Sequence, residues 1–196
     1  MKWLIILGVV LYCHTGICQQ YKLSYDSRNI PELYDEVELA VQQSTGSGGY
    51  KVIRSGYTLQ AETGTIEGKV LKFDRAVVQR NAGTLHFTLT YNKQVHNLTL
   101  TLPVLTKIHF NLYADSIKPV LNYYLNVEGV FSNGKIYPLD VSHVNIAASR
   151  GTMQDMEWIK PAKIDFDKVS FVARYKYDST ITAETTVYIK KGFIQQ

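Results

Sequence analysis

An internal repeat constrains the fold of this chain more than any other feature. The same pattern of apolar and polar residues occurs twice, at a nearly constant offset of 86 to 89 residues. Residues 60–66 read QAETGTI and residues 147–153 read AASRGTM, so a Gly-Thr pair recurs in the same setting. The apolar positions of 37–41 likewise lie over those of 123–127. Self-similarity at a fixed period indicates repeated structural units, and we therefore predict two copies of one unit.

Short runs of alternating apolar and polar residues, typical of half-buried β-strands, fill both copies. A two-residue turn at Asn92-Lys93 would pair 85–89 with 96–100 and place every apolar residue of these runs on one face. The sequence Ser-Asn-Gly-Lys at 132–135 predicts a second hairpin, with Asn-Gly in a type I′ turn. Helical periodicity is scarce, and only 30–34 fits a single helical turn.

Each unit of about 85 residues holds roughly seven short strand candidates, which is the size and spacing of an immunoglobulin-like sandwich. The predicted fold is all-β, with two tandem immunoglobulin-like antiparallel β-sandwiches at 19–105 and 106–196 after an N-terminal signal peptide. Little sequence is left for a linker at the seam, so we expect the domains to abut as a short rod. Gly64 and Gly151 are predicted to be equivalent turn glycines with tight or positive-φ backbone. The alignment also places Tyr21 over Phe110 and Asp26 over Asp115.

Residues 1–18, MKWLIILGVVLYCHTGIC, have the features of an export signal. Lys2 precedes an apolar core of about nine residues, too short for the roughly 20 that a membrane-spanning helix needs. Cleavage before Gln19 would remove both cysteines. A lipid anchor at Cys18 is the alternative, but Ile17 is larger than the residue expected directly before a lipidated cysteine. We predict a secreted, cell-surface or periplasmic protein with no membrane span.

The composition argues against several kinds of chemistry. Without Lys2 the chain has 20 basic and 17 acidic residues, a balance too mild to indicate nucleic-acid binding. A mature chain without cysteine has no thiol chemistry, and we expect no cofactor. His86 and His96 fall on opposite sheet faces, and His143 is expected at the surface or a sheet edge, so no metal site is predicted. Whether calcium binds near Asp115 at the domain seam stays open.

Tyrosine is the one residue type in excess, with 14 in the chain. Alternation places Tyr123 inward and therefore Tyr124 outward, and it also places Tyr188 outward. Exposed tyrosines stack on sugars or contact proteins, so Tyr124 and Tyr188 are the candidate ligand-binding residues. Trp158 is expected to fill the core.

One resemblance adds to this interpretation. The sequence GVFSNGKIYPLDVSHVNIAASRGTM, followed by KVSFVARYKYDSTITAETTVYIKK, resembles a bacterial Ig-like domain of cell-surface and secreted proteins. The shared features are an Asn-Gly turn between strands, a turn of small residues ending in glycine, and two closing alternating strands. The resemblance implies an adhesive, spacer or scaffolding role, and it transfers no catalytic residue.

Three functions follow as hypotheses. The first is a non-catalytic exported protein that acts as a structural spacer or a protein-binding module. The second is a carbohydrate-binding or adhesion module that uses the exposed tyrosines. The third is a hydrolase with its site at the domain seam, which would need polar groups that converge there.

Overall fold

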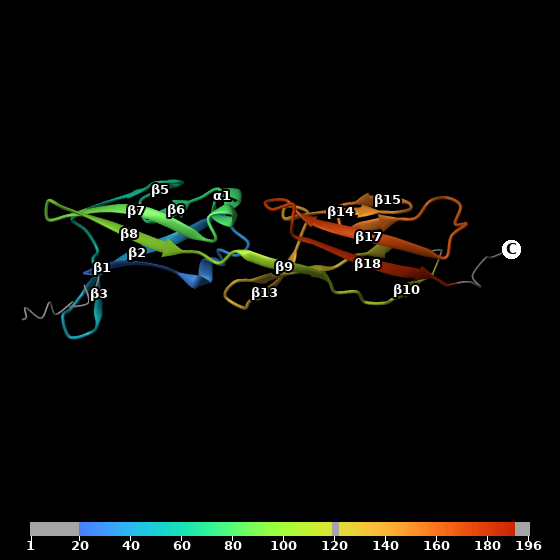
Figure 1. Cartoon of the computed structure of the whole chain (residues 1–196), viewed down its shortest axis with the longest axis horizontal. Helices are drawn as coiled ribbons and strands as arrows, with labels where there is room; N and C mark the ends of the chain where they lie inside the picture. The colour runs from blue at the N-terminus through green and yellow to red at the C-terminus, as the bar shows by residue number, and fades with distance from the viewer. Residues whose placement is uncertain (1–19, 119–121, 191–196) are drawn as a thin grey trace, which may run out of the picture.

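The computed structural model describes residues 20–118 and 122–190 and shows an elongated molecule built from β-strands (Figure 1). The predicted signal peptide, 1–18, lies outside the described residues. All strand pairs are antiparallel except one short parallel pair. The described residues include no helix that is both long and apolar enough to cross a bilayer.

Strand pairing divides the described chain into an N-terminal half, 20–104, and a C-terminal half, 105–190, with no strand pair between them. The elements of the N-terminal half are β1 (Tyr21–Tyr25), the 3₁₀ turn η1 (Ser27–Asn29), β2 (Glu36–Ser44), β3 (Tyr50–Val52), β4 (Tyr57–Ala61), β5 (Thr65–Glu67), β6 (Val70–Lys72), α1 (Arg75–Arg80), β7 (Thr84–Tyr91) and β8 (Gln94–Thr101). Those of the C-terminal half are β9 (Leu105–Phe110), β10 (Ser116–Ile117), β11 (Tyr123–Tyr124), β12 (Val127–Phe131), β13 (Ile136–Leu139), β14 (Val144–Ala148), β15 (Thr152–Gln154), β16 (Glu157–Ile159), β17 (Lys168–Tyr175) and β18 (Thr182–Ile189).

Corresponding strands are paired in the same way within each half. In the N-terminal half one sheet runs β1-β2-β6-β5, with β3 also on β2, and the other runs β4-β7-β8. In the C-terminal half β12 pairs with β9 and β13, β11 pairs with β16, and β16 pairs with β15, while the opposing sheet runs β10-β18-β17-β14. The segment β11–β12 therefore occupies the place of β2. The inward residues of 37–41 and 123–127 are buried in both, as the repeat predicts.

The register of the first predicted hairpin is confirmed. β7 and β8 pair Leu85 with Leu100, Phe87 with Leu98 and Leu89 with His96. The turn residues Asn92 and Lys93 have φ of 49° and 64°, the left-handed values of a type I′ turn. Local alternation was enough here because a slip of one residue would expose the whole apolar face.

The second hairpin is confirmed, but its predicted turn type is wrong. β12 and β13 are hydrogen-bonded neighbours around 132–135, yet only Gly134 of the Asn-Gly pair has positive φ, at 81°. Asn133 instead accepts a hydrogen bond from the amide of Lys135 through its side chain, and it also reaches the other half of the molecule, as described below.

The sequence alignment at the start of each unit is shifted by two residues. Leu23 lies opposite Val41, and Phe110 lies opposite Val127, so the structural counterpart of Phe110 is Leu23 rather than Tyr21. Asp26 and Asp115 are therefore not equivalent. Asp26 caps η1, whereas the carbonyl of Asp115 accepts from the amide of Tyr188 beside β10.

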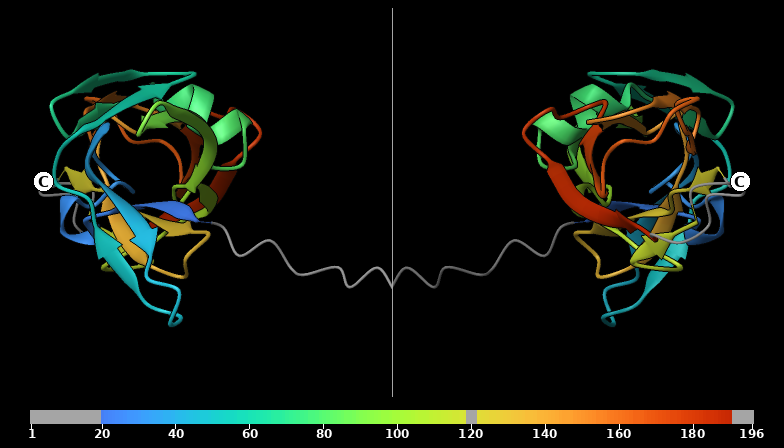
Figure 2. Two further views of the ribbon diagram at one scale, coloured as in Figure 1. Left: turned by 90° about the vertical axis from the view of Figure 1, so that its left-hand side faces the viewer. Right: turned by 90° about the vertical axis from the view of Figure 1, so that its right-hand side faces the viewer.

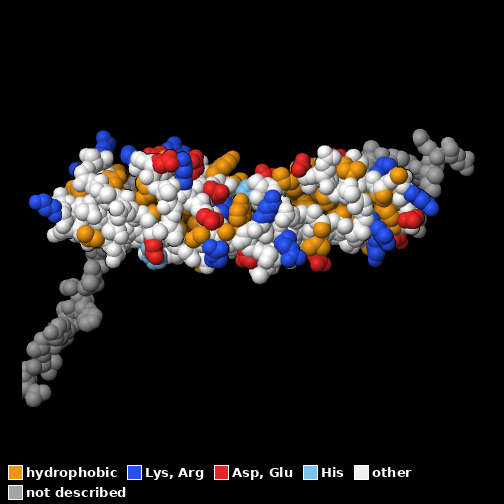
Figure 3. Space-filling view, turned by 90° about the horizontal axis from the view of Figure 1, so that it is seen from above, with side chains coloured by type: hydrophobic (Ala, Val, Ile, Leu, Met, Phe, Trp, Pro, Cys, Tyr) orange, Lys and Arg blue, Asp and Glu red, His pale blue; other side chains and the backbone are white. Residues whose placement is uncertain are grey.

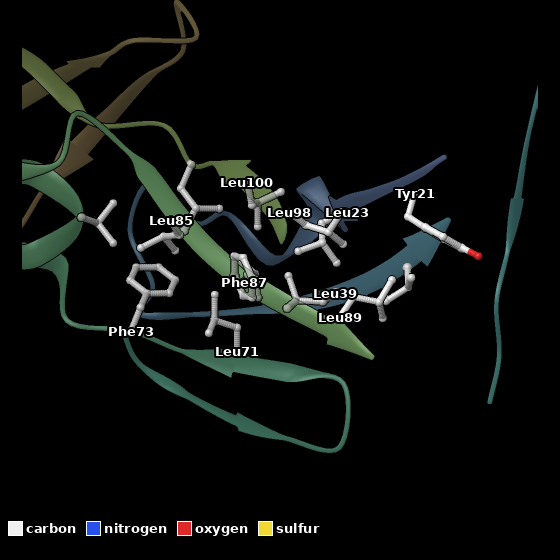
Figure 4. Close-up of a cluster of buried hydrophobic side chains, with 14 residues drawn as sticks. Tyr21, Leu23, Leu39, Leu71, Phe73, Leu85, Phe87, Leu89, Leu98 and Leu100 are labelled. Carbon is white, nitrogen blue, oxygen red and sulfur yellow. The ribbon is translucent and has the colours of Figure 1, made fainter. Parts of the chain in front are cut away.

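The core of each half lies between its two sheets. In the N-terminal half, side chains from β1, β2, β6, β7 and β8 form one buried cluster, in which Leu39, Leu71 and Leu89 are at most 3% exposed (Figure 4). Two clusters fill the C-terminal half, and Trp158 is fully buried there as predicted. Views along the long axis show the strands of the halves arranged around this interior (Figure 2).

Two predicted turn glycines are confirmed. Gly64 and Gly151 each precede the first strand of a short hairpin, β5–β6 and β15–β16, with φ of 89° and 76°. A Cβ on Gly64 would lie 2.5 Å from the carbonyl oxygen of Lys72. These glycines are needed for backbone geometry, in agreement with the structural interpretation of the repeated Gly-Thr pair.

Candidate functional site: the seam between the two halves

The buried charged and polar side chains of the described residues are Glu32, Arg75 and His143, and all three lie where the two halves meet. We call this contact the seam. It joins the loop 30–35 and α1 of the N-terminal half to the start of β9, the β12–β13 turn and the loop 140–143 of the C-terminal half. The sequence analysis found no polar groups converging here.

Arg75 organises the N-terminal side of the seam. It is 4% exposed, and its guanidinium donates to the carbonyl oxygens of Pro31, Glu32 and Tyr34 at 3.1, 2.9 and 2.7 Å. Its Nε also donates to Asp35 Oδ1 at 2.8 Å. A guanidinium has a rigid fork of donors, so one side chain fixes the irregular backbone of the whole loop.

Asp74 fixes the start of the helix that carries Arg75. Its side chain accepts a hydrogen bond from the amide of Ala76 and caps α1, so the helix begins at Arg75. This six-residue helix was not predicted from the sequence, because it is too short to show a helical period. The Asp-Arg-Ala-Val run was the signal available for it.

The predicted single turn at 30–34 is present as hydrogen bonding, since the amides of Leu33 and Tyr34 both donate to the carbonyl of Ile30. Leu33 packs against a core cluster of the C-terminal half. The loop thereby carries an apolar contact across the seam as well as the polar ones.

Glu32 crosses the seam. Its carboxylate is 1% exposed, and Oε1 accepts from Asn133 Nδ2 at 2.7 Å and from Lys135 Nζ at 3.0 Å. Burial acts to raise the pKa of Glu32, but the hydrogen bonds from Asn133, from its own amide and from Lys135 outweigh it, and the pKa is lowered. The same contact raises the pKa of Lys135, so Glu32 and Lys135 form a charged pair.

His143 makes the second crossing. Its Nε2 lies 3.1 Å from the carbonyl oxygen of Leu33, which only accepts, so Nε2 carries the hydrogen. Its Nδ1 lies 2.9 Å from both Asp140 Oδ1 and Ser142 Oγ. The hydrogen bonds from Ser142 and His143 lower the pKa of Asp140 to about 2. A surface position for His143 is wrong, because this histidine is 8% exposed; it directly precedes β14, an edge strand of its sheet, as the sheet-edge alternative expects.

Gln79 of α1 completes the seam beside the chain connection. Its amide donates to the carbonyl of Leu105 at 2.8 Å and accepts from the amide of Leu105 at 3.1 Å. The side chain thus hydrogen-bonds to the first residue of β9 as a neighbouring strand would. Tyr175 of β17 is also close to Arg75: burial raises the pKa of Tyr175 to about 12, and Arg75 acts against this rise.

The candidate ligand-binding tyrosines lie elsewhere. Tyr124 and Tyr188 are 56% and 58% exposed, so their predicted outward orientation is confirmed. Tyr124 belongs to the β11-β16-β15 sheet and Tyr188 to the opposing sheet, and the core lies between these sheets. They point from opposite faces, and the structure does not bring them together. Ligand binding by either stays a prediction.

The described residues contain no group of three or more His, Cys, Asp or Glu side chains that could hold a metal ion. Glu32 Oε2 is buried without a hydrogen-bond partner, but Glu32 belongs to no such group. The expected position of Asp115 near the seam is wrong, because Asp115 lies beside Tyr188 at the end of β18 that is farthest from Arg75 (Figure 1), so it brings no carboxylate to the seam.

Comparison with known proteins gives matches to structures only. No protein-family model matches the chain, and no curated protein matches it significantly. Domains 4 and 5 of the S-layer protein SbsC match with 13% identity and a TM-score of 0.33, over 87% of this chain and 96% of that one. Domains 4–9 of the same protein match with 13% identity and a TM-score of 0.32, over 90% of this chain and 31% of that one. TM-scores this low carry no argument about fold or function.

Proposed function

We propose that this chain is a rigid, non-catalytic rod of two immunoglobulin-like domains, exported to the cell surface or the periplasm as a structural spacer or protein-binding module. Strand pairing supports the domain assignment. When β3 is left out of the count, sheets of order β1-β2-β6-β5 and β4-β7-β8 have the connectivity of an immunoglobulin constant-type sandwich, in which the first, second, fifth and fourth strands face the third, sixth and seventh.

The proposed boundary falls between Val104 and Leu105, one residue before the position predicted from the sequence. Val104 packs against the N-terminal core, and Leu105 belongs to a core cluster of the C-terminal half. A connection this short leaves no flexible tether. The sequence-based export signal at 1–18 remains the basis for the proposed location.

The observation that carries the spacer proposal is that the buried polar side chains of the seam are bonded to other protein groups. Glu32, Arg75 and His143 each bond to protein atoms, and two of these contacts cross between the halves. A hydrolase would need such groups free to meet a substrate. Their bonds to other protein groups instead favour a fixed angle between the domains. Adhesion through Tyr124 or Tyr188 is a second proposal, favoured by their exposure.

Small-angle X-ray scattering tests the rod. We expect the scattering curve of the full chain to fit one extended conformation. The flexible comparator is a variant with a Gly-Ser linker inserted after Pro103, whose curve should require an ensemble. If the unmodified chain also requires an ensemble, the rigid-spacer proposal is wrong.

A further inference from the structure

The end of the N-terminal half farthest from the seam carries positive charge without compensating acids. Residues 39–61 contain Lys51 and Arg54 and no Asp or Glu, and the β7–β8 hairpin, 84–101, contains Lys93 and likewise no Asp or Glu. The face seen in Figure 3 shows Lys and Arg side chains at its left-hand end, while the Asp and Glu side chains lie farther along the molecule. This separation of charge is local, because the net charge of the whole chain is only +4.

Two adjoining grooves are cut into this region. The first, of about 530 Å³, is lined by Gln43, Lys51, Arg54, Ser55 and Tyr91, among others. The second, of about 420 Å³, also contains Arg54 and Ser55 and continues past Tyr57 and Thr58 to Lys69. The grooves share Arg54 and Ser55, so they adjoin at these two residues. No Asp or Glu lines either groove.

The strands explain this arrangement. β3 pairs with the end of β2, so Lys51 lies beside Gln43, and Gln43 lies beside Tyr21 of β1. Tyr57 of β4 lies opposite Tyr91 of β7 in the other sheet, next to the β7–β8 turn. The first groove is therefore lined from both sheets, by cationic and amide side chains of one and an aromatic ring of the other.

The lining chemistry selects a ligand class. Guanidinium and ammonium groups bind carboxylates and other anions by charge-assisted hydrogen bonds. The half-exposed rings of Tyr57 and Tyr91 offer apolar faces on which sugar rings stack. The amide of Gln43 and the hydroxyls of Ser55 and Thr58 suit sugar hydroxyls. An open path along the surface fits a polymer better than an enclosed small molecule.

We propose that these two grooves bind an anionic polysaccharide, with Arg54 at the junction and Lys51 and Lys69 on either side. This site differs from Tyr124 and Tyr188, which lie in the other half. It would attach one end of the molecule to a charged glycan and leave the C-terminal half free. The proposal depends on the grooves alone, and it would hold even if the molecule were flexible at the seam.

The test uses the full chain and a matched pair of ligands. Oligogalacturonate carries one carboxylate on each sugar, and its methyl ester has the same sugars without the charge. By calorimetric titration we expect the acid form to bind at least about tenfold more tightly than the ester, with the difference reduced by added salt. Equal binding of the two forms, or binding of neither, would overturn the proposal.

A pair of double variants locates the site. Lys51→Gln with Arg54→Gln should weaken binding of the acid form by at least about tenfold. Lys163→Gln with Lys168→Gln removes the same charge from exposed positions of the C-terminal half and should leave the affinity unchanged. An equal loss in both variants would show a non-specific charge effect and refute the site.

Polyglutamate of equal charge separates glycan from peptide recognition. We expect it to bind more weakly than oligogalacturonate, because it lacks ring faces for the tyrosines. Equal or tighter binding of polyglutamate would overturn the assignment to a polysaccharide. All the substituted side chains are exposed, so unchanged thermal unfolding should accompany each variant.

Discussion

At the scale of single residues, two glycines with the same backbone conformation provide a matched test of packing. Gly151 and Gly134 have φ of 76° and 81°, but a Cβ on Gly151 would lie 2.5 Å from Trp158 Nε1 and 2.6 Å from the carbonyl oxygen of Ile159. Nothing lies within 4 Å of a Cβ on Gly134. We expect Gly151→Ala to lower the free energy of unfolding by about 2–4 kcal/mol and Gly134→Ala by about 1 kcal/mol. Urea unfolding measures both, and equal losses would contradict the predicted clash.

Two arginines that pair with aspartates differ mainly in burial. Arg75 is 4% exposed and holds three carbonyls as well as Asp35, whereas Arg28, on Asp26, is 88% exposed. Arg75→Met should lower the free energy of unfolding by about 2–4 kcal/mol, because buried acceptors lose their partner. Arg28→Met should cause no measurable change, as is usual for exposed pairs. No measurable loss in Arg75→Met would mean that the loop 30–35 does not depend on Arg75.

The carboxyl of Asp140 predicts a pH dependence. Its pKa is lowered from 3.8 to about 2 by the hydrogen bonds of Ser142 and His143. Because the folded-state pKa is the lower one, the stabilisation is complete above about pH 4 and is lost as the pH falls towards about 2. In urea titrations Asp140→Asn should be less stable than the unmodified chain at pH 5, and the difference should shrink at pH 2. A constant difference would exclude this linkage.

At the scale of elements, the β7–β8 hairpin offers a stabilising change. Lys93 has φ of 64° in a type I′ turn, where Asn-Gly is the preferred pair. Lys93→Gly should relieve this strain and raise the free energy of unfolding by about 0.5–1 kcal/mol. Thermal and urea unfolding measure the change. Lys163, which is exposed and has no positive φ, gives a comparison variant, Lys163→Gly, for which no gain is expected, and a loss at Lys93 would contradict the turn assignment.

The elements also show what the sequence could predict. The strands and the β7–β8 register follow from alternation within about ten residues. The repeat also predicts that β11–β12 of the second copy corresponds to β2 of the first. The seam follows from no local pattern, because its contacts join residues far apart in the sequence. Glu32 and Asn133 are 101 positions apart, and Leu33 and His143 are 110 positions apart. The turn type at 132–135 was mispredicted for the same reason, since Asn133 is used in a contact with the distant loop.

At the scale of the whole molecule, the seam determines whether the halves unfold together. Each half has its own core, so each has the buried surface that independent folding requires. Coupling depends on Leu33, on the Glu32 contacts with Asn133 and Lys135, and on the His143 contact with Leu33. Removing these polar contacts leaves both cores intact and changes only their interaction, so loss of coupling should appear as loss of cooperativity.

We therefore expect one calorimetric transition for the unmodified chain and two for the double variant Glu32→Ala with His143→Ala. The comparison variant, Glu67→Ala with Lys72→Ala, removes an exposed ion pair inside the N-terminal half and should keep a single transition. Two transitions in the unmodified chain would mean that the seam is too weak to couple the halves. One transition in the seam variant would assign the coupling to the contacts that remain, namely the apolar contact of Leu33 and the hydrogen bonds of Gln79 to Leu105. Either result would mean that the polar contacts of Glu32 and His143 do not supply the rigidity that the spacer function requires.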